Sequence, residues 1–300
     1  MAEMKRVIAL GFFDGVHRGH GELLKKTRQR AEEIGAMPSV LSFDVHPDTL
    51  VFKKEVPLIN SAIGREDLIR RYYGIDNVVF LHFNQHVMHM PWKEFIDSLI
   101  AELNIAWIVV GHDFCFGYKG EGNPQLLKET CQELGVGCDI IPRVEQDGIT
   151  VSSTYIRTLV AQGEIERANE FLGHPYTLSD RVSHGKKLGT TLGFPTVNLK
   201  LKENVLSPAK GVYATKVILE NGDTHLAVTN VGTRPTIDDG NQLTIEGFIL
   251  DFHGDLYGQK IQMEFYKYLR EERKFPSFEA LTAEVMHNAD QTREYFAQNP

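Results

Sequence analysis

Two histidines near the start of the chain, His17 and His20, have the type and spacing of a phosphate-binding pair. Residues three positions apart on the first turn of a helix point to the same side, so both imidazoles would face one anion. A helix start also gathers unpaired backbone N–H groups and the positive end of the macrodipole, which attract phosphate. The alternative is a tight, glycine-rich turn that carries two exposed histidines.

The segments on either side of the pair are those that such a site needs. The apolar run Val7–Leu10 predicts a short buried strand, and residues 19–35, with apolar side chains near helical spacing, predict a helix. The histidines would therefore lie at a strand-to-helix turn. Three glycines would leave room there for a bulky ligand beside the main chain: Gly11, Gly15 and Gly19.

The whole string from Gly11 to His20 resembles a specific signature. It is similar to GxFDGVHxGH of the HxGH nucleotidylyltransferases, in the form used by bacterial bifunctional riboflavin kinase/FAD synthetases, although that family usually has Asn in place of Phe12. The resemblance implies that His17 and His20 are catalytic. It also implies nucleotide or phosphate contacts from Gly11, Phe13, Asp14, Gly15 and Gly19.

Composition favours a soluble two-domain enzyme. At 300 residues the chain exceeds the usual size of one core, and its net charge of −8 argues against nucleic acid as a partner. Its three cysteines lack CxxC spacing, which indicates neither a disulfide framework nor a zinc site. We expect a cytoplasmic protein without secretory leader or membrane span, a monomer or weak oligomer whose partners are small molecules.

Short apolar runs alternate with amphipathic segments up to about residue 141. Helices are predicted at Pro91–Leu103 and after Asn123-Pro124. Strands are predicted at Val40–Phe43, Val78–Phe83, Trp107–Val110 and Cys138–Ile141. This βαβ order predicts a doubly wound parallel sheet, whose ligands bind beyond the carboxyl ends of the strands.

Two of those strand ends extend the resemblance. Residues 42–47, Ser-Phe-Asp-Val-His-Pro, stand where the family has a TFxPHP-like loop, and residues 110–117 stand where it has VGxDFxFG. The resemblance implies flavin contacts from Phe43, His46, Pro47, Asp113 and Phe116. Core packing is the alternative for the two phenylalanines.

A third motif, residues 151–157, is similar to the second phosphate motif of the superfamily, SSTxIR. It would place hydroxyls at a helix start and an arginine one turn later, able to hold a pyrophosphate bidentately. The resemblance implies a catalytic Arg157 and phosphate contacts from Ser152, Ser153 and Thr154. The alternative is an ordinary helix cap.

His82, His86 and His89 lie within eight residues and could bind zinc. Their surroundings resemble a connecting segment of the same family that holds no metal. We therefore favour a surface loop over a metal site.

The pattern changes after Gly173-His174-Pro175, where helical stripes give way to strands. This predicts a first domain at residues 1–176 and an antiparallel second domain at 177–300. Asn221-Gly222 would join Val212–Leu219 to His225–Thr229 as a hairpin, and His253–Asp255 would similarly connect Leu243–Asp251 to Ile261–Leu269. A closing helix capped by Ser277 would carry on one face Phe278, Leu281, Val285 and Ala289.

This second half resembles riboflavin kinases, which implies a β-barrel with a terminal helix. Residues 193–198 match the GFPTxN motif, whose Thr196 and Asn198 would hold Mg²⁺ and the ATP phosphates. Residues 184–189 correspond to a phosphate loop with Gly185, Lys186 and Gly189, although Leu188 replaces the usual Arg. Glu246 would be the catalytic carboxylate, without the His that usually follows two residues later. Flavin contacts are implied for Arg270 and Phe275.

Ordinary explanations exist for these residues too. Glu246 could be a charge on the wet face of an antiparallel strand, although Phe248 and Leu250 share that face. Thr196 and Asn198 could serve turn chemistry beside a proline.

Together the two resemblances imply an enzyme of flavin cofactor biosynthesis. It would phosphorylate riboflavin to FMN with ATP and adenylylate FMN to FAD with release of pyrophosphate. One alternative is an adenylyltransferase whose barrel only binds flavin, and another is a non-enzymatic flavin sensor.

Overall fold

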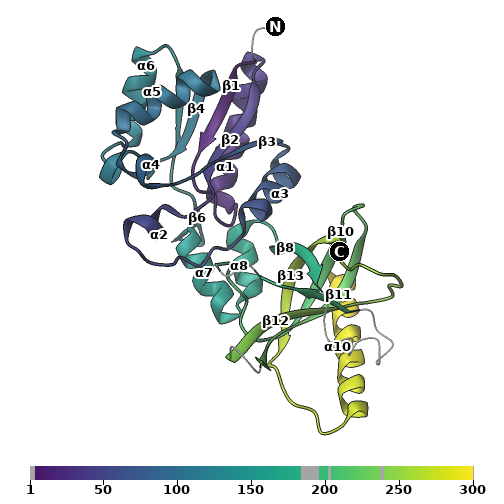
Figure 1. The fold of residues 1–300 in the computed structure, drawn as a ribbon. Helices are drawn as coiled ribbons and strands as arrows, with labels where there is room; N and C mark the ends of the chain where they lie inside the picture. Colours follow the sequence, from purple (N-terminus) through teal and green to yellow (C-terminus); the bar gives the residue numbers. More distant parts are fainter. Residues whose placement is uncertain (1–3, 184–195, 202–203, 237–239, 300) are drawn as a thin grey trace. The chain divides into compact units, whose positions relative to one another are not determined.

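A five-stranded parallel sheet, in the order β3-β2-β1-β4-β5, forms the first part of the computed structural model (Figure 1). The structure describes residues 4–183, 196–201, 204–236 and 240–299. The strand order reverses between β1 and β4, which is where open sheets of this kind bind ligands. The strands are β1 (Arg6–Leu10), β2 (Met37–Phe43), β3 (Asn77–Leu81), β4 (Ile105–Gly111) and β5 (Gly137–Ile141).

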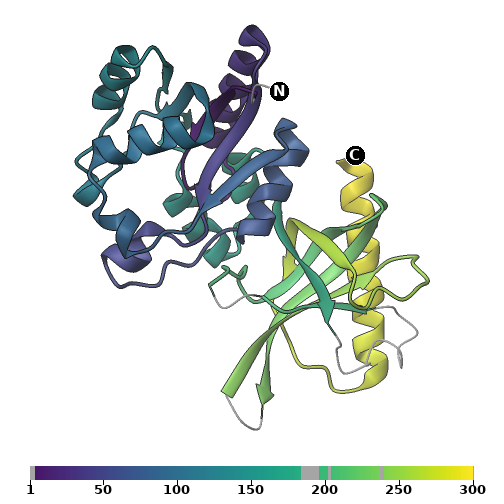
Figure 2. The same ribbon diagram turned by 45° about the horizontal axis from the view of Figure 1, so that its top comes forward.

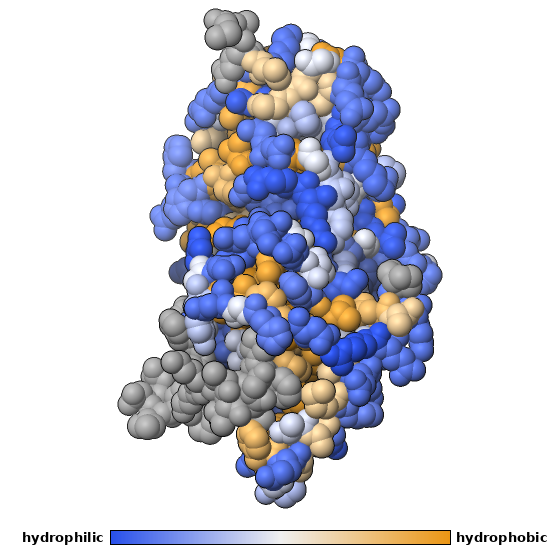
Figure 3. Space-filling view, turned by 90° about the vertical axis from the view of Figure 1, so that its right-hand side faces the viewer, coloured by the Kyte–Doolittle hydropathy of each residue, from blue (hydrophilic) through white to orange (hydrophobic). Residues whose placement is uncertain are grey.

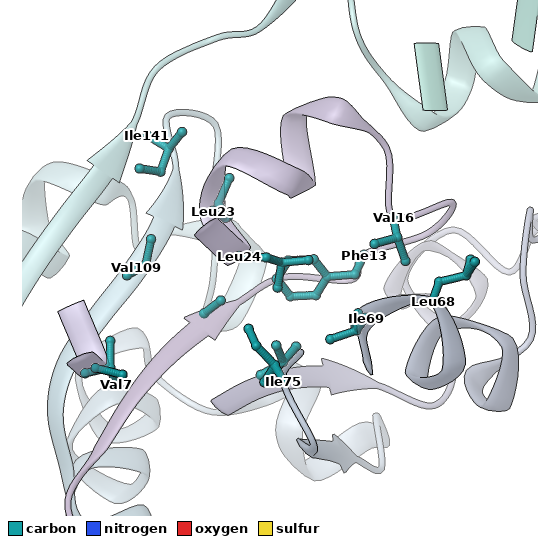
Figure 4. Packing of buried hydrophobic residues seen from close by; sticks show 13 residues of the cluster. Val7, Phe13, Val16, Leu23, Leu24, Leu68, Ile69, Ile75, Val109 and Ile141 are labelled. Atoms are coloured by element: carbon teal, nitrogen blue, oxygen red, sulfur yellow. The ribbon is translucent and has the colours of Figure 1, made fainter. Parts of the chain in front are cut away.

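Helices cover both faces of this sheet, because alternate residues of a buried strand point to opposite sides. On one face, Val7 and Ala9 share a core with residues of α1 (Arg18–Ile34) and α3 (Ala62–Tyr73), as Figure 4 shows. On the other face, Ile8 and Leu10 share a core with α5 (Trp92–Leu103) and α6 (Pro124–Glu133). The predicted doubly wound sheet is confirmed.

Several shorter elements lie between these helices and strands. Asn123 caps α6 as its sequence predicts, because its Oδ1 accepts hydrogen bonds from the N–H groups of Gln125 and Leu126. The sequence did not predict α3, nor the hairpin that precedes the SSTxIR motif. The short elements are α2 (Pro47–Val51), α4 (Gln85–His89), η1 (Tyr118–Gly120), β6 (Glu145–Gln146) and β7 (Ile149–Thr150).

The chain divides into two units, each with most contacts inside itself. The first comprises Met1–Leu58 and Ala62–Ser153, and the second comprises Ile59–Ser61 and Thr154–Pro300. Most of α7 (Ser153–Gln162) and all of α8 (Ile165–Leu172) therefore belong to the second unit. Asn169 of α8 ties this pair to the strands that follow, since its Nδ2 donates to the Phe265 carbonyl at 2.9 Å and its Oδ1 accepts from the Tyr176 N–H at 2.7 Å.

The second unit contains a closed antiparallel barrel in the order β10-β11-β12-β9-β8-β13. Asn221 and Gly222 turn the chain between β10 and β11, so the first predicted hairpin is confirmed. The predicted barrel class with a terminal helix is confirmed as well. The strands are β8 (Tyr176–Ser183), β9 (Thr196–Leu199), β10 (Gly211–Leu219), β11 (Thr224–Thr236), β12 (Gly240–Ile249) and β13 (Lys260–Arg270).

The segment around His253–Asp255 does not form the second predicted hairpin. It connects β12 to β13, but β12 pairs with β11 and β9, whereas β13 pairs with β10 and β8. Closure of the barrel takes up both edges of each strand, so strands that are consecutive in sequence end up apart. A local turn pattern cannot distinguish the two outcomes.

Helix α10 (Phe278–Gln298) lies along the outside of the barrel (Figures 1 and 2). Ser277 caps it as predicted, with its Oγ accepting from the Ala280 N–H at 3.2 Å. The predicted apolar face is only partly right, because Phe278 is 46% exposed whereas Ala289 is buried. The buried positions of the helix all lie in its second half: Asn288, Ala289, Thr292 and Phe296.

No helix within the described ranges is long and apolar enough to cross a membrane. On the face drawn in Figure 3, hydrophilic residues predominate and apolar residues gather in small groups among them.

Candidate active sites

The turn between β1 and α1 has an unusual backbone. Phe13 and Val16 have positive φ angles of 58° and 43°, and Gly15 has a φ of 82°. Bulky residues avoid this region, so something must hold them in it. Both apolar side chains are fully buried in the core beneath α1 (Figure 4), and their burial offsets the strain. The turn therefore starts α1 directly beyond the carboxyl end of β1.

His17 and His20 lie together at the start of α1. The Nδ1 atom of His17, the N-cap residue, accepts a hydrogen bond from the His20 N–H at 3.3 Å. Because Nδ1 is an acceptor here, the proton of a neutral His17 is on Nε2. The two rings stack with their centroids 3.6 Å apart and their planes 12° from parallel.

The electrostatic surroundings of His20 favour its neutral form. Burial is the largest cause that lowers the pKa of His20 well below 6.5, and the positive charges of His17 and Arg65 lower it further. Its Nδ1 is buried and has no hydrogen-bond partner among the described residues. Because His20 is neutral, the two adjacent imidazoles carry at most one positive charge.

Gly19 leaves room for the imidazole ring of His17. A Cβ atom at this position would lie 3.2 Å from Cε1 and Nδ1 of His17. Such a contact is tighter than side chains normally make, so a larger residue would displace the imidazole ring.

The second phosphate motif meets this turn through Ser153. The Ser153 hydroxyl donates to the carbonyl oxygen of Asp14 at 2.9 Å, and Asp14 itself is buried. Ser152 is half-buried and Thr154 is exposed. Arg157 is half-buried on α7, one turn after Ser153, and belongs to the second unit.

The end of β2 carries the residues expected to contact flavin. Phe43 packs its ring edge against Phe83 with centroids 5.2 Å apart. His46 caps α2 by accepting from the Asp48 N–H at 3.2 Å, and its ring lies edge-on to Phe12 with centroids 4.5 Å apart. Pro47 occupies the first turn of α2. Phe12 and His46 are thus neighbours at the ends of β1 and β2.

Asp44, in the same loop, is paired with His82. The carboxylate lies 2.6 Å from His82 Nδ1 and accepts from the Phe83 N–H at 3.1 Å. Partial burial raises the pKa of Asp44, but the hydrogen bonds from His82 and Phe83 outweigh it and hold the pKa below its usual value.

The other two histidines of the predicted cluster lie on one short helix. His86 and His89 lie on the short helix α4 rather than in a loop, and His89 Nδ1 lies 2.7 Å from the Gln85 carbonyl. Within the described ranges, no three His, Cys, Asp or Glu side chains converge as metal ligands.

At the end of β4, the two predicted flavin residues differ in exposure. Asp113 is highly exposed. Phe116 is 6% exposed and packs in the core with Trp92, Phe95 and Phe114. Core packing, the alternative given for this phenylalanine, accounts for its position.

Arg65 is a buried charge at the site that sequence analysis missed. Its side chain is fully buried on α3 and donates to the Phe12 and Phe43 carbonyls. A sequence signal existed: Arg65 is three and four residues before Leu68 and Ile69, so it shares their buried face.

The barrel brings Glu246 and Asn198 face to face. Glu246 of β12 pairs with Asn198 of β9, and Phe248 pairs with Thr196, in antiparallel register. Directly opposed residues of an antiparallel pair point to the same side. All four are half-buried, whereas the alternating Val197, Leu199, Ile245 and Ile249 are buried on the opposite, inner side.

Phe248, which stands in place of the family's histidine, belongs to an apolar cluster. Its ring packs with Val228, Leu250 and Ala289, the last of which is on α10. The face that carries Glu246 is therefore not fully wet, because its next same-side neighbour lies partly under the terminal helix.

The loop after β13 is held near these strands and α10. A Cβ on Gly232 would lie 2.1 Å from Glu272 Oε1, so the carboxylate of Glu272 lies directly over this glycine. Arg270 forms an ion pair with Glu284 at 2.9 Å and donates to Asn288 Oδ1 at 3.1 Å, and its guanidinium lies 5.6 Å from the Phe275 ring. Burial lowers the pKa of Arg270. Gly185, Lys186, Leu188 and Gly189 lie outside the described residues.

Both halves match known families. A model of FAD synthetases matches residues 1–155 and a model of riboflavin kinases matches residues 172–296. A bifunctional riboflavin kinase/FMN adenylyltransferase of Listeria monocytogenes is 36% identical over 99% of this chain and 94% of its own length. The chain belongs to this bifunctional family. Its recognition from the sequence motifs is confirmed.

Other family members agree over nearly the whole chain. The Bacillus subtilis protein is 34% identical over 98% of this chain and 94% of its own length. The Escherichia coli protein is 35% identical over 97% and 92%, respectively. A crystal structure described as a macrolide-efflux protein from Streptococcus pneumoniae is 29% identical and has a TM-score of 0.83, covering 98% of this chain and 95% of that one.

Proposed function

We propose that this chain phosphorylates riboflavin to FMN and then adenylylates FMN to FAD, both with ATP. The observation that carries the proposal is the stacked pair of His17 and His20 at the start of α1, in a chain whose barrel also opposes Glu246 to Asn198. The histidine pair lies in the part of the chain that matches FAD synthetases, and the Glu246–Asn198 pair lies in the part that matches riboflavin kinases.

In adenylyl transfer, a phosphate oxygen of FMN attacks the α-phosphorus of ATP in line. A new P–O bond forms, the bond to the β-phosphate bridging oxygen breaks, and pyrophosphate leaves. Phosphate is already a nucleophile, so the protein needs only to position the reactants and stabilise charge. The Nε2–H of His17, a ring N–H of His20 and the positive end of the α1 dipole would bind the transferring phosphate.

In the kinase reaction, Glu246 would accept the proton of the riboflavin 5′-hydroxyl as that oxygen attacks the γ-phosphorus of ATP. ADP is the leaving group. Glu246 is opposite Asn198 in the strand register and two residues before Phe248, so an amide and an apolar ring are its neighbours on this side of the strands. Asn198 and Thr196, two residues apart on one strand, would orient the phosphates.

Two of these residues fit a magnesium ion. Thr196 offers a hydroxyl and Asn198 a carbonyl oxygen, both on the same side of β9. Oxygen ligands of this kind, together with substrate phosphates, are what Mg²⁺ prefers. When bound, the ion would neutralise charge on the ATP phosphates.

We also propose where the protein acts and with what. Its partners are the small-molecule substrates riboflavin, FMN and ATP, and we place it in the cytoplasm. We expect it to act as a monomer or weak oligomer without nucleic acid or membrane.

The two half-reactions test the proposal separately. The full chain is incubated with Mg²⁺ and ATP plus either riboflavin or FMN, and flavins are separated by chromatography while pyrophosphate release is followed. We expect FMN from riboflavin, and FAD with equimolar pyrophosphate from FMN. The reactions are run with and without a reductant to compare oxidised and reduced flavin. If FMN yields no FAD under either condition, the adenylyltransferase proposal is wrong; failure to make FMN removes the kinase proposal alone.

A further inference from the structure

Arg65 is a fully buried cation within the first unit. Its guanidinium lies 4.3 Å from the ring centroid of Phe12 and 5.2 Å from that of Phe80. No carboxylate among the described residues hydrogen-bonds to it. Burying a charge without a paired counterion costs free energy. We therefore expect a role for either the Arg65 charge or its N–H donors.

The donors of Arg65 join the ends of two strands. Nη1 lies 2.5 Å from the Phe12 carbonyl and 2.6 Å from Ser42 Oγ, and Nη2 lies 2.9 Å from the Phe43 carbonyl. Ser42 Oγ also donates to the Phe12 carbonyl at 2.8 Å. The planar fork of one side chain thus fixes the residue that opens the strained turn after β1 and the last residue of β2.

The charge of Arg65 also acts on the histidine pair. The charged groups facing His20 are His17 and Arg65, and both disfavour a proton on it. Burial lowers the pKa of Arg65 to about 10, although the carboxylates of Asp14 and Asp44 oppose that fall. Arg65 therefore keeps its charge from pH 5 to 9, the range of the assay described below.

We propose that Arg65 is a positioning residue for adenylyl transfer: its guanidinium fork holds the turn that bears His17 and His20, and its charge disfavours a further cation at that turn. The proposal rests on the function proposed above. Protonation of His20 would add a charge to a buried ring beside the Arg65 cation, so adenylyl transfer must decline when His20 takes up a proton. Removing the charge of Arg65 moves that decline to higher pH.

Three variants separate the charge from the hydrogen bonds. Arg65→Met removes both, Arg65→Lys keeps the charge without the fork, and Arg65→Gln keeps a planar amide donor without the charge. The kcat/KM of FAD formation is measured from pH 5 to 9 in the full chain, and circular dichroism with thermal unfolding of the same samples reports folding. The ring C2 proton of His20, assigned with His20→Asn, is titrated by NMR without substrates.

The charge predicts how the pH profiles move. In the parent and in Arg65→Lys, the acidic decline and the NMR titration of His20 lie at the same pH, below 6.5. In Arg65→Met and Arg65→Gln both move to higher pH. Arg65→Lys also lacks the planar guanidinium that holds the turn. We therefore expect its turnover to fall by about tenfold or more, because the histidines would no longer be held in position.

Two results would overturn the proposal. One is an uncharged variant in which His20 titrates as in the parent and FAD forms at the parental rate. The other decides the case even if neither uncharged variant folds: an Arg65→Lys chain with parental turnover, or with its acidic decline moved upward. A parent that makes no FAD would refute the proposed function instead, while the substrate-free NMR titration would still test the effect of Arg65 on His20.

Discussion

The imidazoles of His17 and His20 stack with a centroid separation of 3.6 Å, and one of the pair has a pKa lowered by its own surroundings. This makes the pair a fixed set of N–H donors at the start of α1. We expect His17→Ala or His20→Ala to reduce FAD formation on the order of a hundredfold or more, the usual cost of losing one donor to a reacting phosphate or oxyanion. Riboflavin phosphorylation should continue, so that FMN accumulates. Near-parental adenylyl transfer in a variant with an intact circular dichroism spectrum would contradict this role.

Glu246 has the converse prediction. Glu246→Gln keeps the shape and the hydrogen-bonding capacity beside Asn198 but cannot accept a proton at neutral pH. We expect FMN formation from riboflavin to fall by at least a hundredfold, since general-base catalysis contributes about 10² to 10⁴. FAD formation from added FMN serves as the control and should not change. Equal rates of FMN formation in the variant and the parent would show that another group takes the proton.

Protein stability should depend on pH through His20. Its pKa is lowered in the folded state, so the unfolded chain binds the proton more readily. The free energy of unfolding must therefore fall as the pH drops below 6.5 and level off once the folded state is also protonated. The measurement is urea unfolding at pH 8 to 5 for the parent and for His20→Asn. A parent that loses no more stability than the variant over this range would count against the burial of a neutral His20.

Phe248 shows why restoring a family residue need not restore activity. Its ring packs with Val228, Leu250 and Ala289, so Phe248→His would place a polar ring among apolar side chains. We expect the barrel to lose about 1 to 3 kcal/mol of stability, with no gain in kinase turnover. Phe248→Leu, which keeps an apolar side chain, is the matched control. A stable and faster His variant would show that the ring can turn toward Glu246.

The predicted domain boundary makes a fragment of residues 1–176 a direct test. This fragment contains the parallel sheet but removes β13, whose Phe265 carbonyl accepts from Asn169. We expect it to fold and adenylylate FMN, with α8 less stable by about 1 kcal/mol for this lost hydrogen bond alone. Thermal unfolding of the fragment and of the Asn169→Ala full chain would measure the loss. An insoluble or inactive fragment would show that the barrel is needed to complete the first unit.

Much of the architecture was accessible from local pattern. Asn123 and Ser277 predicted helix starts correctly because a cap is made by residues two or three positions away. The strands of the sheet were predicted because burial on both faces leaves continuous apolar runs. The predicted site residues themselves come from motifs and stay predictions until the variants are assayed.

What local pattern could not supply was the identity of distant partners. The missing hairpin between β12 and β13 and the exposure of Phe278 both depend on how the barrel closes and where α10 packs on it. Arg65 looks like an ordinary helix charge until the carbonyls of Phe12 and Phe43, more than twenty positions earlier, are brought to it. Such contacts join residues far apart in the sequence, so they leave no periodic pattern from which they could be predicted.

The short segment Ile59–Ser61 belongs to the second unit although the first unit surrounds it in sequence. Asn60 donates to the Thr177 carbonyl at 2.7 Å, across 117 positions of chain. On a ribosome adding about 5 to 20 residues per second, Asn60 is made roughly 6 to 23 seconds before Thr177. The nascent sheet can assemble in that interval, but this loop reaches its final conformation only after synthesis of the barrel has begun.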